Sequence, residues 1–373
     1  MSQKYDYLIV GAGFSGSTLA RLLAEKLDKK ILLIDKRNHI AGNAYDMLDN
    51  AGVLIHKYGP HIFHTQDKNV WDFLSLYTKW NYYQHWVLSF VDGMLVPIPI
   101  NINTINTLYG THFNAFNIAD FFNSIKVDIP NIQTSKDIVV SQVGEELYNK
   151  FFKNYTKKQW GVDPSELDKA VAGRIPIRHN FDNRYFSDKY QGIPKYGYTK
   201  LFENMLNHNN IEIKLNADFN SIKNHINYNN LIYCGAIDEF YDYEFGKLPY
   251  RSLKFEFESF ECEKYQNAPV INYPNDYDFT RISEYKYFTQ QKHSFTTISK
   301  EYPSLATSKE EEKYYPIPRG DNFAIFKKYK EKSLQEKNTI FIGRLAEYKY
   351  YNMDNVVSQA IEIFDNIKTK EIQ

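Results

Sequence analysis

The chain has 373 residues, room for roughly two or three compact units, and its 45 basic and 45 acidic side chains give no formal net charge. A neutral chain has no overall field that would draw it to nucleic acid or to an anionic membrane. We expect no membrane span, because no run of about 18 apolar residues occurs. We also expect no signal peptide, because an apolar strand follows the N-terminus at once. The two cysteines, Cys234 and Cys262, suit a reducing compartment such as the cytoplasm.

The first 35 residues have the order strand, glycine-rich turn, helix and strand. Apolar runs at 7–10 and 31–34 predict strands, and the amphipathic pattern over 15–27 predicts a helix. The turn reads Gly-Ala-Gly-Phe-Ser-Gly over 11–16, and Asp35 follows the second strand. Glycines at such a turn let the backbone approach a pyrophosphate, and the acidic residue can hold a ribose hydroxyl. The pattern predicts a dinucleotide site, leaves FAD and NAD both open, and has a turn without ligand as its alternative.

The middle of the chain changes from strands to helices. Residues 87–91 and 94–96 predict a hairpin across Asp92-Gly93, which Pro97 and Pro99 would end. From Asn103 onward the pattern is helical. Further signals in this part are Ser135 as a helix cap, a helix over 144–160 that Gly161 and Pro164 stop, and a loop over 168–177.

The remainder predicts a helix at 198–206 and a closing helix at about 355–367. The strands expected here lie at 211–215, 231–234, 253–257, 294–299 and 339–342. We expect the final strand and helix to return to the first unit, which makes that unit discontinuous in sequence.

Aromatic residues make up 16% of the chain, and many of them lie in polar stretches rather than in apolar runs. The helix that ends at Trp160 presents Phe151, Phe152 and Tyr155 within ten residues. A plain core helix is one interpretation, and a platform on which a base stacks is the other. The polar residues Thr156 and Gln159 among these aromatics favour the second.

The run from His56 to Thr65 holds three histidines, which raises the question of a metal. Their spacing fits no zinc pattern and neither cysteine nor carboxylate completes a site, so we expect no metal and a loop that packs against a cofactor ring. Arg174 lies in a loop, Arg281 follows a stretch rich in tyrosine and aspartate, and Arg344 follows the turn at Gly343. At each position a guanidinium can grip phosphate oxygens or form a surface ion pair. No serine triad, paired-carboxylate motif or P-loop stands out, which indicates chemistry performed by the cofactor.

Together these residues resemble the UDP-galactopyranose mutase family over nearly the whole chain. The segments that carry the resemblance are 11–16, 35–37, 42–45, 58–65, 155–160 (Tyr-Thr-Lys-Lys-Gln-Trp), 173–178, 245–253 (with Arg-Ser-Leu), 314–318 and 343–345. The family implies an α/β fold with a discontinuous Rossmann-like FAD domain, a small helical domain and a twisted antiparallel sheet domain. The expected boundaries are 1–80, about 205–240 and 318–373 for the first, 101–180 for the second, and 81–100, about 181–204 and 241–317 for the third.

The resemblance also implies residue roles. The FAD contacts would come from Gly11, Gly13, Phe14, Ser15, Asp35, Lys36, Asn43, His61, Ile62, Phe219, Gly343, Arg344 and Met353. The substrate contacts would come from Gln84, Phe151, Phe152, Tyr155, Thr156, Trp160, Tyr185, Asn272, Tyr315 and Tyr350. Arg174 and Arg281 would clamp the diphosphate, and the loop with Arg174 would close over the substrate.

The activity implied is that of an isomerase, with a flavin that works without net redox. N5 of reduced FAD would attack the anomeric carbon of UDP-galactose, UDP would leave, and the sugar would return to UDP as the pyranose or the furanose. The family further implies a cytoplasmic homodimer that serves cell-surface polysaccharide synthesis, with neither nucleic acid nor membrane as a partner.

Four positions depart from the family pattern: Ala41 replaces a glycine, Ala236 a proline, Asn352 an aspartate, and Gln84 lies near an asparagine position. Because Asn352 removes a charge where the sugar or the flavin would lie, a UDP-N-acetylgalactosamine mutase is an alternative. Two readings of other classes are an FAD-dependent oxidoreductase and a nucleotide-sugar binding protein without turnover. The oxidoreductase leaves Arg174, Arg281 and the aromatic helix unexplained. The intact arginines and the glycine turn argue against a binding protein without turnover.

Overall fold

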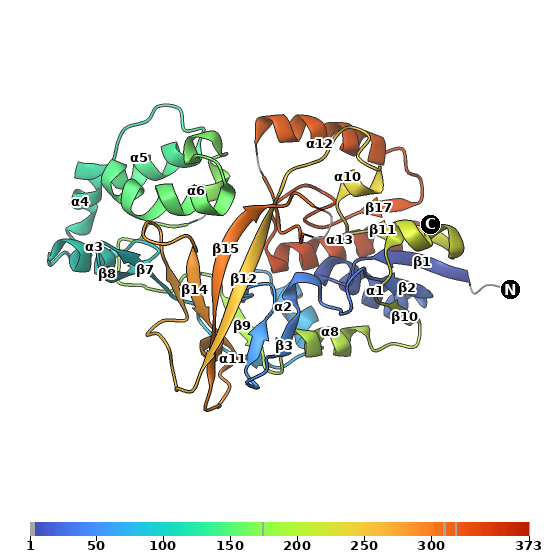
Figure 1. Ribbon diagram of the computed structural model, residues 1–373. Helices are drawn as coiled ribbons and strands as arrows, with labels where there is room; N and C mark the ends of the chain where they lie inside the picture. Colours follow the sequence, from blue (N-terminus) through green and yellow to red (C-terminus); the bar gives the residue numbers. More distant parts are fainter. Residues whose placement is uncertain (1–3, 174, 309–310, 318, 373) are drawn as a thin grey trace.

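The computed structural model describes residues 4–173, 175–308, 311–317 and 319–372 (Figure 1). One end of the molecule is a parallel sheet with the strand order β10-β2-β1-β11-β17. Its strands are β1 (Lys4–Val10), β2 (Ile31–Ile34), β10 (Ile211–Lys214), β11 (Asn227–Tyr233) and β17 (Thr339–Phe341). The sheet combines distant segments of the chain, which agrees with a unit that is discontinuous in sequence. The predicted α/β class with a Rossmann-like unit is confirmed, whereas the domain boundaries stay predictions.

Helices pack on this sheet through apolar side chains. Helix α1 (Phe14–Leu27) lies against the C-terminal helix α13 (Met353–Ile372) and near α8 (Tyr198–Leu206). Leu19 and Leu23 of α1 are fully buried together with Ala360 and Phe364 of α13. Each buried leucine contributes on the order of 2 kcal/mol to the free energy of folding. This packing ties the end of the chain to its beginning.

A second, largely antiparallel sheet crosses the middle of the molecule in the order β16-β12-β15-β14-β13-β7-β8. Its strands are β7 (Val87–Val91), β8 (Met94–Ile98), β12 (Tyr250–Phe260), β13 (Val270–Asn272), β14 (Arg281–Glu284), β15 (Thr296–Leu305) and β16 (Tyr315–Pro316). The prediction that Pro97 ends the hairpin is wrong, since Pro97 pairs with Leu88 inside β8. Because β8 is an edge strand, proline's missing N–H costs no ladder bond.

A helical unit forms the other end of the molecule (Figure 1). It consists of α3 (Ile102–Tyr109), α4 (Ile118–Ile125), α5 (Ser135–Leu147), the π-helical turn η2 (Tyr148–Lys153), α6 (Asn154–Trp160), the 3₁₀ turn η3 (Pro164–Glu166) and α7 (Ala170–Gly173). Its core is apolar, with Ile105, Phe122, Val143 and Leu147 buried.

Two local predictions in this unit need correction. The cap of α5 is Thr134, whose hydroxyl accepts from the backbone N–H of Asp137 while the Asp137 carboxylate accepts from that of Thr134. Ser135 is the first helical residue instead, and its Oγ donates to the carbonyl of Asp168 at 2.7 Å. The predicted loop over 168–177 contains the short helix α7, because a single turn leaves no periodic pattern in a sequence.

The remaining elements connect these layers. The strands are β3 (Asp46–Leu48), β4 (Leu54–His56), β5 (Phe63–Thr65), β6 (Trp80–Asn81) and β9 (Tyr190–Pro194), and the helices are η1 (Gly42–Ala44), α2 (Lys68–Ser75), α9 (Phe219–Ile222), η4 (Lys223–His225), α10 (Ile237–Phe240), α11 (Tyr285–Thr289) and α12 (Gly320–Ser333). No helix in the described part of the chain combines the length and the apolar character that a bilayer crossing requires.

Candidate functional site

The glycine turn between β1 and α1 brings the backbone to the carboxyl edge of the parallel sheet. Gly11 has a φ of +108°, and a Cβ at Gly16 would lie 2.0 Å from the carbonyl oxygen of Gly11, so only glycine fits here. Gly13 starts α1, and no side chain caps this helix end. The first N–H groups of α1 therefore lack a side-chain acceptor, which suits the N-terminus for an anionic group.

Asp35, at the end of β2, has a second task in this turn. Its carboxylate accepts from the backbone N–H of Ala12 and of Arg37, both at 2.9 Å. The carboxylate is buried, with 8% of the residue exposed. It therefore braces the two loops that follow β1 and β2, and so fixes the geometry of the glycine turn as well as bordering the site.

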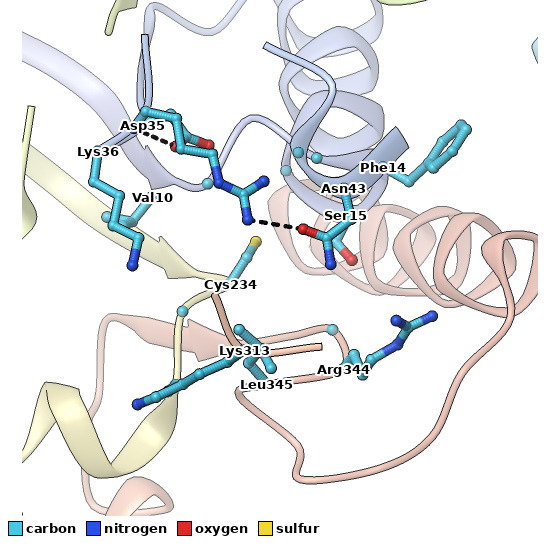
Figure 2. Close-up of a pocket in the computed structure, with 18 of the residues that line it drawn as sticks. Val10, Phe14, Ser15, Asp35, Lys36, Asn43, Cys234, Lys313, Arg344 and Leu345 are labelled. Carbon is cyan, nitrogen blue, oxygen red and sulfur yellow. Dashed lines mark hydrogen bonds between the residues drawn. The ribbon is translucent and has the colours of Figure 1, made fainter. Parts of the chain in front are cut away.

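A cavity of about 250 Å³ opens above this turn (Figure 2). Of the residues predicted to contact FAD, it is lined by Gly11, Gly13, Phe14, Ser15, Asp35, Lys36, Asn43, His61, Phe219, Gly343, Arg344 and Met353. Ile62 is not among the lining residues and packs in the apolar core instead. Gly42 approaches the turn closely, because a Cβ there would lie 3.0 Å from the Cα of Gly13, and its lack of a side chain keeps this edge of the cavity open.

Sequence reasoning missed several residues of this first cavity. The Arg37 guanidinium donates to Asn43 at 2.8 Å and to Glu312 at 3.0 Å, and it lies over the ring of Tyr58. Burial raises the pKa of Glu312, but the hydrogen bond from Arg37 and its positive charge, with that of Lys36, together outweigh burial and hold this pKa below its ordinary value. No sequence signal links Arg37 to a carboxylate so far along the chain, whereas Cys234 was within reach because it is the last residue of a predicted strand.

His61 presents a defined tautomer at the cavity. Its Nδ1 lies 2.8 Å from the carbonyl oxygen of Gly59 and must donate, so Nε2 is the unprotonated acceptor. Its backbone N–H donates to Nδ1 of His56 at 3.0 Å, which places the proton of the fully buried His56 on Nε2. Burial lowers the pKa of each histidine to about 3, so both rings are neutral near pH 7.

The third histidine of the run, His64, turns away from the other two. Its Nδ1 lies 2.8 Å from the carboxylate of Asp188, and its ring stacks on Phe186. Among the residues that the structure describes, no group of three or more histidine, cysteine or acidic side chains is arranged to hold a metal ion.

A second cavity, of about 110 Å³, lies between the helical unit and the antiparallel sheet. Of the predicted substrate residues, it is lined by Phe151, Phe152, Tyr155, Thr156, Trp160, Tyr185, Asn272, Arg281, Tyr315 and Tyr350. The structure adds Ile98, Gln159, Val171, Ala172 and Ile175. Gln84 is exposed and does not line the cavity, so the structure does not bring it to this site. Arg174 lies outside the described residues.

A helical irregularity builds the aromatic wall of the second cavity. Gly144, with a φ of +73°, kinks α5, and the chain then makes the π-helical turn η2 before α6 begins. Phe151 and Phe152 lie on this turn and are 2% and 4% exposed. A π-helical turn holds an additional residue compared with α-helix, and such turns are frequent at functional sites. Two neighbouring rings thus reach the same cavity.

Arg281 is the one described arginine that lines this cavity. Its Nε and Nη2 donate to one oxygen of Glu301 at 2.9 and 2.6 Å, and Glu301 is 1% exposed. Burial disfavours the charged guanidinium, but the adjacent Glu301 carboxylate outweighs this and raises the pKa of Arg281. The guanidinium is therefore a permanent, oriented positive charge at the cavity wall.

The two cavities meet at a wall of aromatic rings. Arg344 lines the first cavity, and its guanidinium lies 5.0 Å from the ring centre of Tyr315 and 5.5 Å from that of Tyr350. These two rings stack on each other and line the second cavity, with Trp160 close by. A parallel sheet with a glycine turn, joined to an aromatic cavity with a fixed cation, defines a Rossmann-like α/β protein with two adjacent cavities.

Comparisons with known proteins identify the family. Residues 150–350 match the family model described as UDP-galactopyranose mutase, and residues 9–76 match an NAD(P)-binding Rossmann-like domain. An Escherichia coli dTDP-fucopyranose mutase is 42% identical, over 95% of this chain and 96% of its own. A Mycoplasma pneumoniae UDP-galactopyranose mutase is 35% identical, over 96% of this chain and 95% of its own. The chain belongs to the UDP-galactopyranose mutase family and is an isomerase.

Solved structures share the fold of this chain. A crystal structure of reduced UDP-galactopyranose mutase superimposes with a TM-score of 0.78 at 17% identity, covering 98% of this chain and 96% of that one. A structure of putrescine oxidase with bound putrescine superimposes with a TM-score of 0.59 at 11% identity, and the match covers 99% of this chain and 100% of that one. At such identities these matches define the fold alone.

Proposed function

We propose that the protein is a flavin-dependent mutase that interconverts the pyranose and furanose forms of UDP-galactose. The observation that carries this proposal is the contact between the two cavities at Arg344, Tyr315 and Tyr350. A cofactor in the first cavity and a sugar nucleotide in the second would meet across this wall. Membership of the family, with relatives of that activity at 35% identity over nearly the full length, supports the proposal.

We assign the first cavity to FAD. The glycine turn and the uncapped N-terminus of α1 would hold the pyrophosphate, while Asp35 and Lys36 would border the ribose. His61, Arg344 and Met353 would lie toward the flavin ring. Reduced flavin, when bound, would supply through N5 the nucleophile that displaces UDP from the anomeric carbon, with no net oxidation of the sugar.

The second cavity would bind the nucleotide. A base stacked on Phe151, Phe152 or Tyr155 gains on the order of 1–3 kcal/mol, and polar groups of Thr156 and Asn272 are close enough to orient it. Because these rings lie on η2 and α6, the base would be held by the helical unit.

Arg281 would bind the diphosphate. The negative charge on UDP increases as the glycosidic bond breaks, so a guanidinium that Glu301 already orients stabilises the transition state without reorganisation. From the family resemblance, we propose Arg174 as the second clamp and Tyr315 and Tyr350 as donors to the same phosphates.

A second candidate substrate follows from one relative. The most identical of the relatives reported above is a dTDP-fucopyranose mutase, at 42%. The side chains of Gln159, Thr156 and Asn272 can pair with the ring carbonyl and imide groups that uracil and thymine share, so this lining admits either base. We therefore propose a dTDP-6-deoxyhexose as the alternative substrate, and UDP-N-acetylgalactosamine as the third to be assayed.

The decisive experiment is chromatography of UDP-galactofuranose after incubation with the flavin-loaded protein, with and without dithionite. We expect conversion to UDP-galactopyranose when dithionite has reduced the protein, and none without dithionite. Parallel reactions use dTDP-fucopyranose and UDP-N-acetylgalactosamine, and faster turnover of either would reassign the substrate. If reduced, flavin-loaded protein converts none of the three, the proposed mutase activity is wrong.

We extend the family resemblance to the assembly and the setting. We propose a homodimer that acts in the cytoplasm, provides furanose sugars for cell-surface polysaccharides, and is divided into the FAD, helical and sheet domains expected from the sequence. Light scattering after gel filtration tests the dimer, since a single chain has a mass of 44.0 kDa.

A further inference from the structure

The segment that joins α7 to β9 leaves the second cavity after Ile175 and returns to it at Tyr185. We call residues 176–184, which lie between these two, the excursion. Ala172 and Ile175 line the cavity before the excursion, and Tyr185 lines it afterwards. Between them the chain folds onto the first turn of α3, where the N–H of Ile102 donates to the carbonyl of Asn180 at 3.2 Å. The position of Tyr185 thus depends on how this excursion is held.

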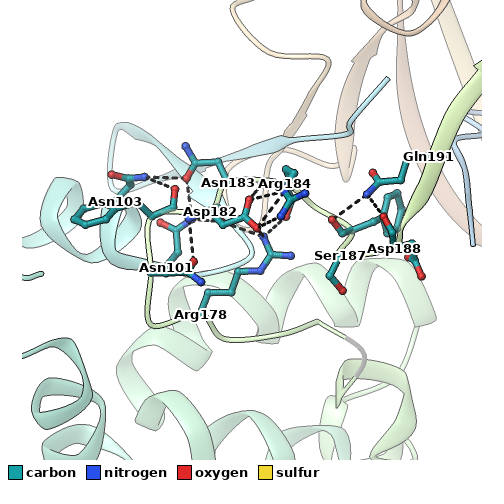
Figure 3. A network of polar contacts seen from close by, with 12 residues as sticks. Asn101, Asn103, Arg178, Asp182, Asn183, Arg184, Ser187, Asp188 and Gln191 are labelled. Atoms are coloured by element: carbon teal, nitrogen blue, oxygen red, sulfur yellow. Dashed lines mark hydrogen bonds and ion pairs between the residues drawn. The ribbon is translucent and has the colours of Figure 1, made fainter. Parts of the chain in front are cut away.

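Arg178 holds the excursion from inside (Figure 3). Its Nη1 donates to the carbonyl of Asp182 at 3.0 Å and also to the carbonyl of Arg184, the residue directly before Tyr185. Its backbone N–H donates to the carbonyl of Ile100 at 2.9 Å. Arg178 is 9% exposed, so water does not compete strongly for these carbonyls.

Two asparagines at the start of α3, the capping residue Asn101 and Asn103, contact the same excursion. The side-chain amide of Asn101, which is fully buried, donates to the carbonyl of Asp182 at 3.1 Å and to Oδ1 of Asn183 at 2.8 Å. Asn103 donates to Oδ1 of Asn183 at 3.0 Å. In Figure 3 these side chains surround the backbone on which Arg178 converges.

Tyr185 is then set by the strand-like contacts that follow. Its N–H donates to the carbonyl of His85 at 2.6 Å, and the backbone of Arg184 forms an antiparallel β-bridge with Trp86. A tyrosine can border a nucleotide with both its ring and its hydroxyl, provided that its backbone is fixed. The register of this contact depends on the carbonyl of Arg184, which Arg178 binds.

We propose that Arg178 is a positioning residue for nucleotide binding, acting through the carbonyls of Asp182 and Arg184 on Tyr185. The proposal rests on the assignment of the second cavity to the nucleotide. Arg178 lies outside the lining of that cavity, so its effect on affinity is indirect.

The test measures the Kd of UDP by calorimetry for R178K and for the control R184K, at a temperature well below unfolding of either. Lysine at 178 keeps the charge but is shorter and lacks the planar guanidinium, whose Nη1 reaches both carbonyls. Lysine at 184 changes an exposed side chain and leaves its carbonyl in place. We expect the Kd to rise about tenfold for R178K, equal to about 1.4 kcal/mol, and less than about twofold for R184K.

A double-mutant cycle with Tyr185→Ala separates positioning from stability. If Arg178 acts through Tyr185, R178K raises the Kd in the wild-type background but leaves it unchanged in the Tyr185→Ala background. Equal effects in both backgrounds, or a lowered melting temperature with an unchanged Kd, would overturn the proposal.

If R178K does not fold, Asn103→Ala removes a weaker contact to the same excursion and should raise the Kd about threefold, with the same dependence on Tyr185. Wild-type protein that binds neither UDP nor dTDP would instead overturn the nucleotide site itself, and this proposal with it.

Discussion

Stability should fall steeply below neutral pH because burial holds several histidines in neutral form, His56 and His85 among them. His56 and His85 are 0% and 6% exposed, and burial lowers the pKa of each from 6.5 to about 3. Arg281 and His64 also act to lower the pKa of His85. The unfolded chain binds a proton on each ring below about pH 6.5, whereas the folded chain stays neutral until about pH 3, so protons favour unfolding throughout this window.

The magnitude follows from linkage. Between about pH 7.5 and pH 5, each of these histidines should remove about 2 kcal/mol from the free energy of unfolding, and the value hardly depends on the folded pKa as long as that lies below about 4. His85→Phe places a ring of similar size among Tyr83, Phe186 and Phe288, which surround His85.

The assay is urea unfolding, followed by tryptophan fluorescence, of wild type and His85→Phe at both pH values. We expect the wild type to lose about 2 kcal/mol more than the variant on acidification, whatever the variant costs at pH 7.5. Equal losses in wild type and His85→Phe would refute the argument from burial.

Three further variants test the site and its support. Glu301→Gln leaves the Arg281 guanidinium without its counter-charge and should cost about 3 kcal/mol in thermal unfolding, together with most of kcat; an unchanged melting temperature would contradict the buried pair. Gly144→Ala places a Cβ 2.2 Å from the last carbonyl of α4 and should cost well over the roughly 1 kcal/mol expected for Gly110→Ala, where φ is +62° in open space. Trp160→Ala should raise the Kd of UDP at least about tenfold by calorimetry, and an unaltered Kd would place the nucleotide elsewhere.

Local sequence patterns were sufficient where short-range physics decides the structure. The turn at 11–16 predicts β1, α1 and β2, because glycine spacing and apolar runs act within a few residues. Helix α8 has the predicted bounds Tyr198–Leu206 because its apolar periodicity is complete and Gly197 precedes it. The strands β11, β12 and β15 were found but are longer than predicted, since pairing partners extend them beyond their apolar cores.

The rest depends on tertiary contacts that no local pattern contains. The turn η2 reads as ordinary helix in sequence, because its one additional residue shifts the apolar pattern within a single short turn, which periodicity does not resolve. Arg37 and Glu312 are 275 positions apart, and only the return of the chain to the first unit brings them together. Most of the candidate site residues came from the family resemblance, and of these Gln84 is exposed and lies outside the lining of the second cavity.

If the two cavities take the proposed ligands, the wall that they share would make their occupancies interdependent. Arg344 borders one cavity while its guanidinium rests on Tyr315 and Tyr350 of the other. A ligand that shifts this stack in one cavity thereby changes the free energy of binding in its neighbour. Thermodynamic linkage requires the effect to be equal in both directions, so whatever factor the sugar nucleotide applies to cofactor affinity, the cofactor applies to the sugar nucleotide. The stacked tyrosines and their arginine would thus be a coupling element as well as a boundary.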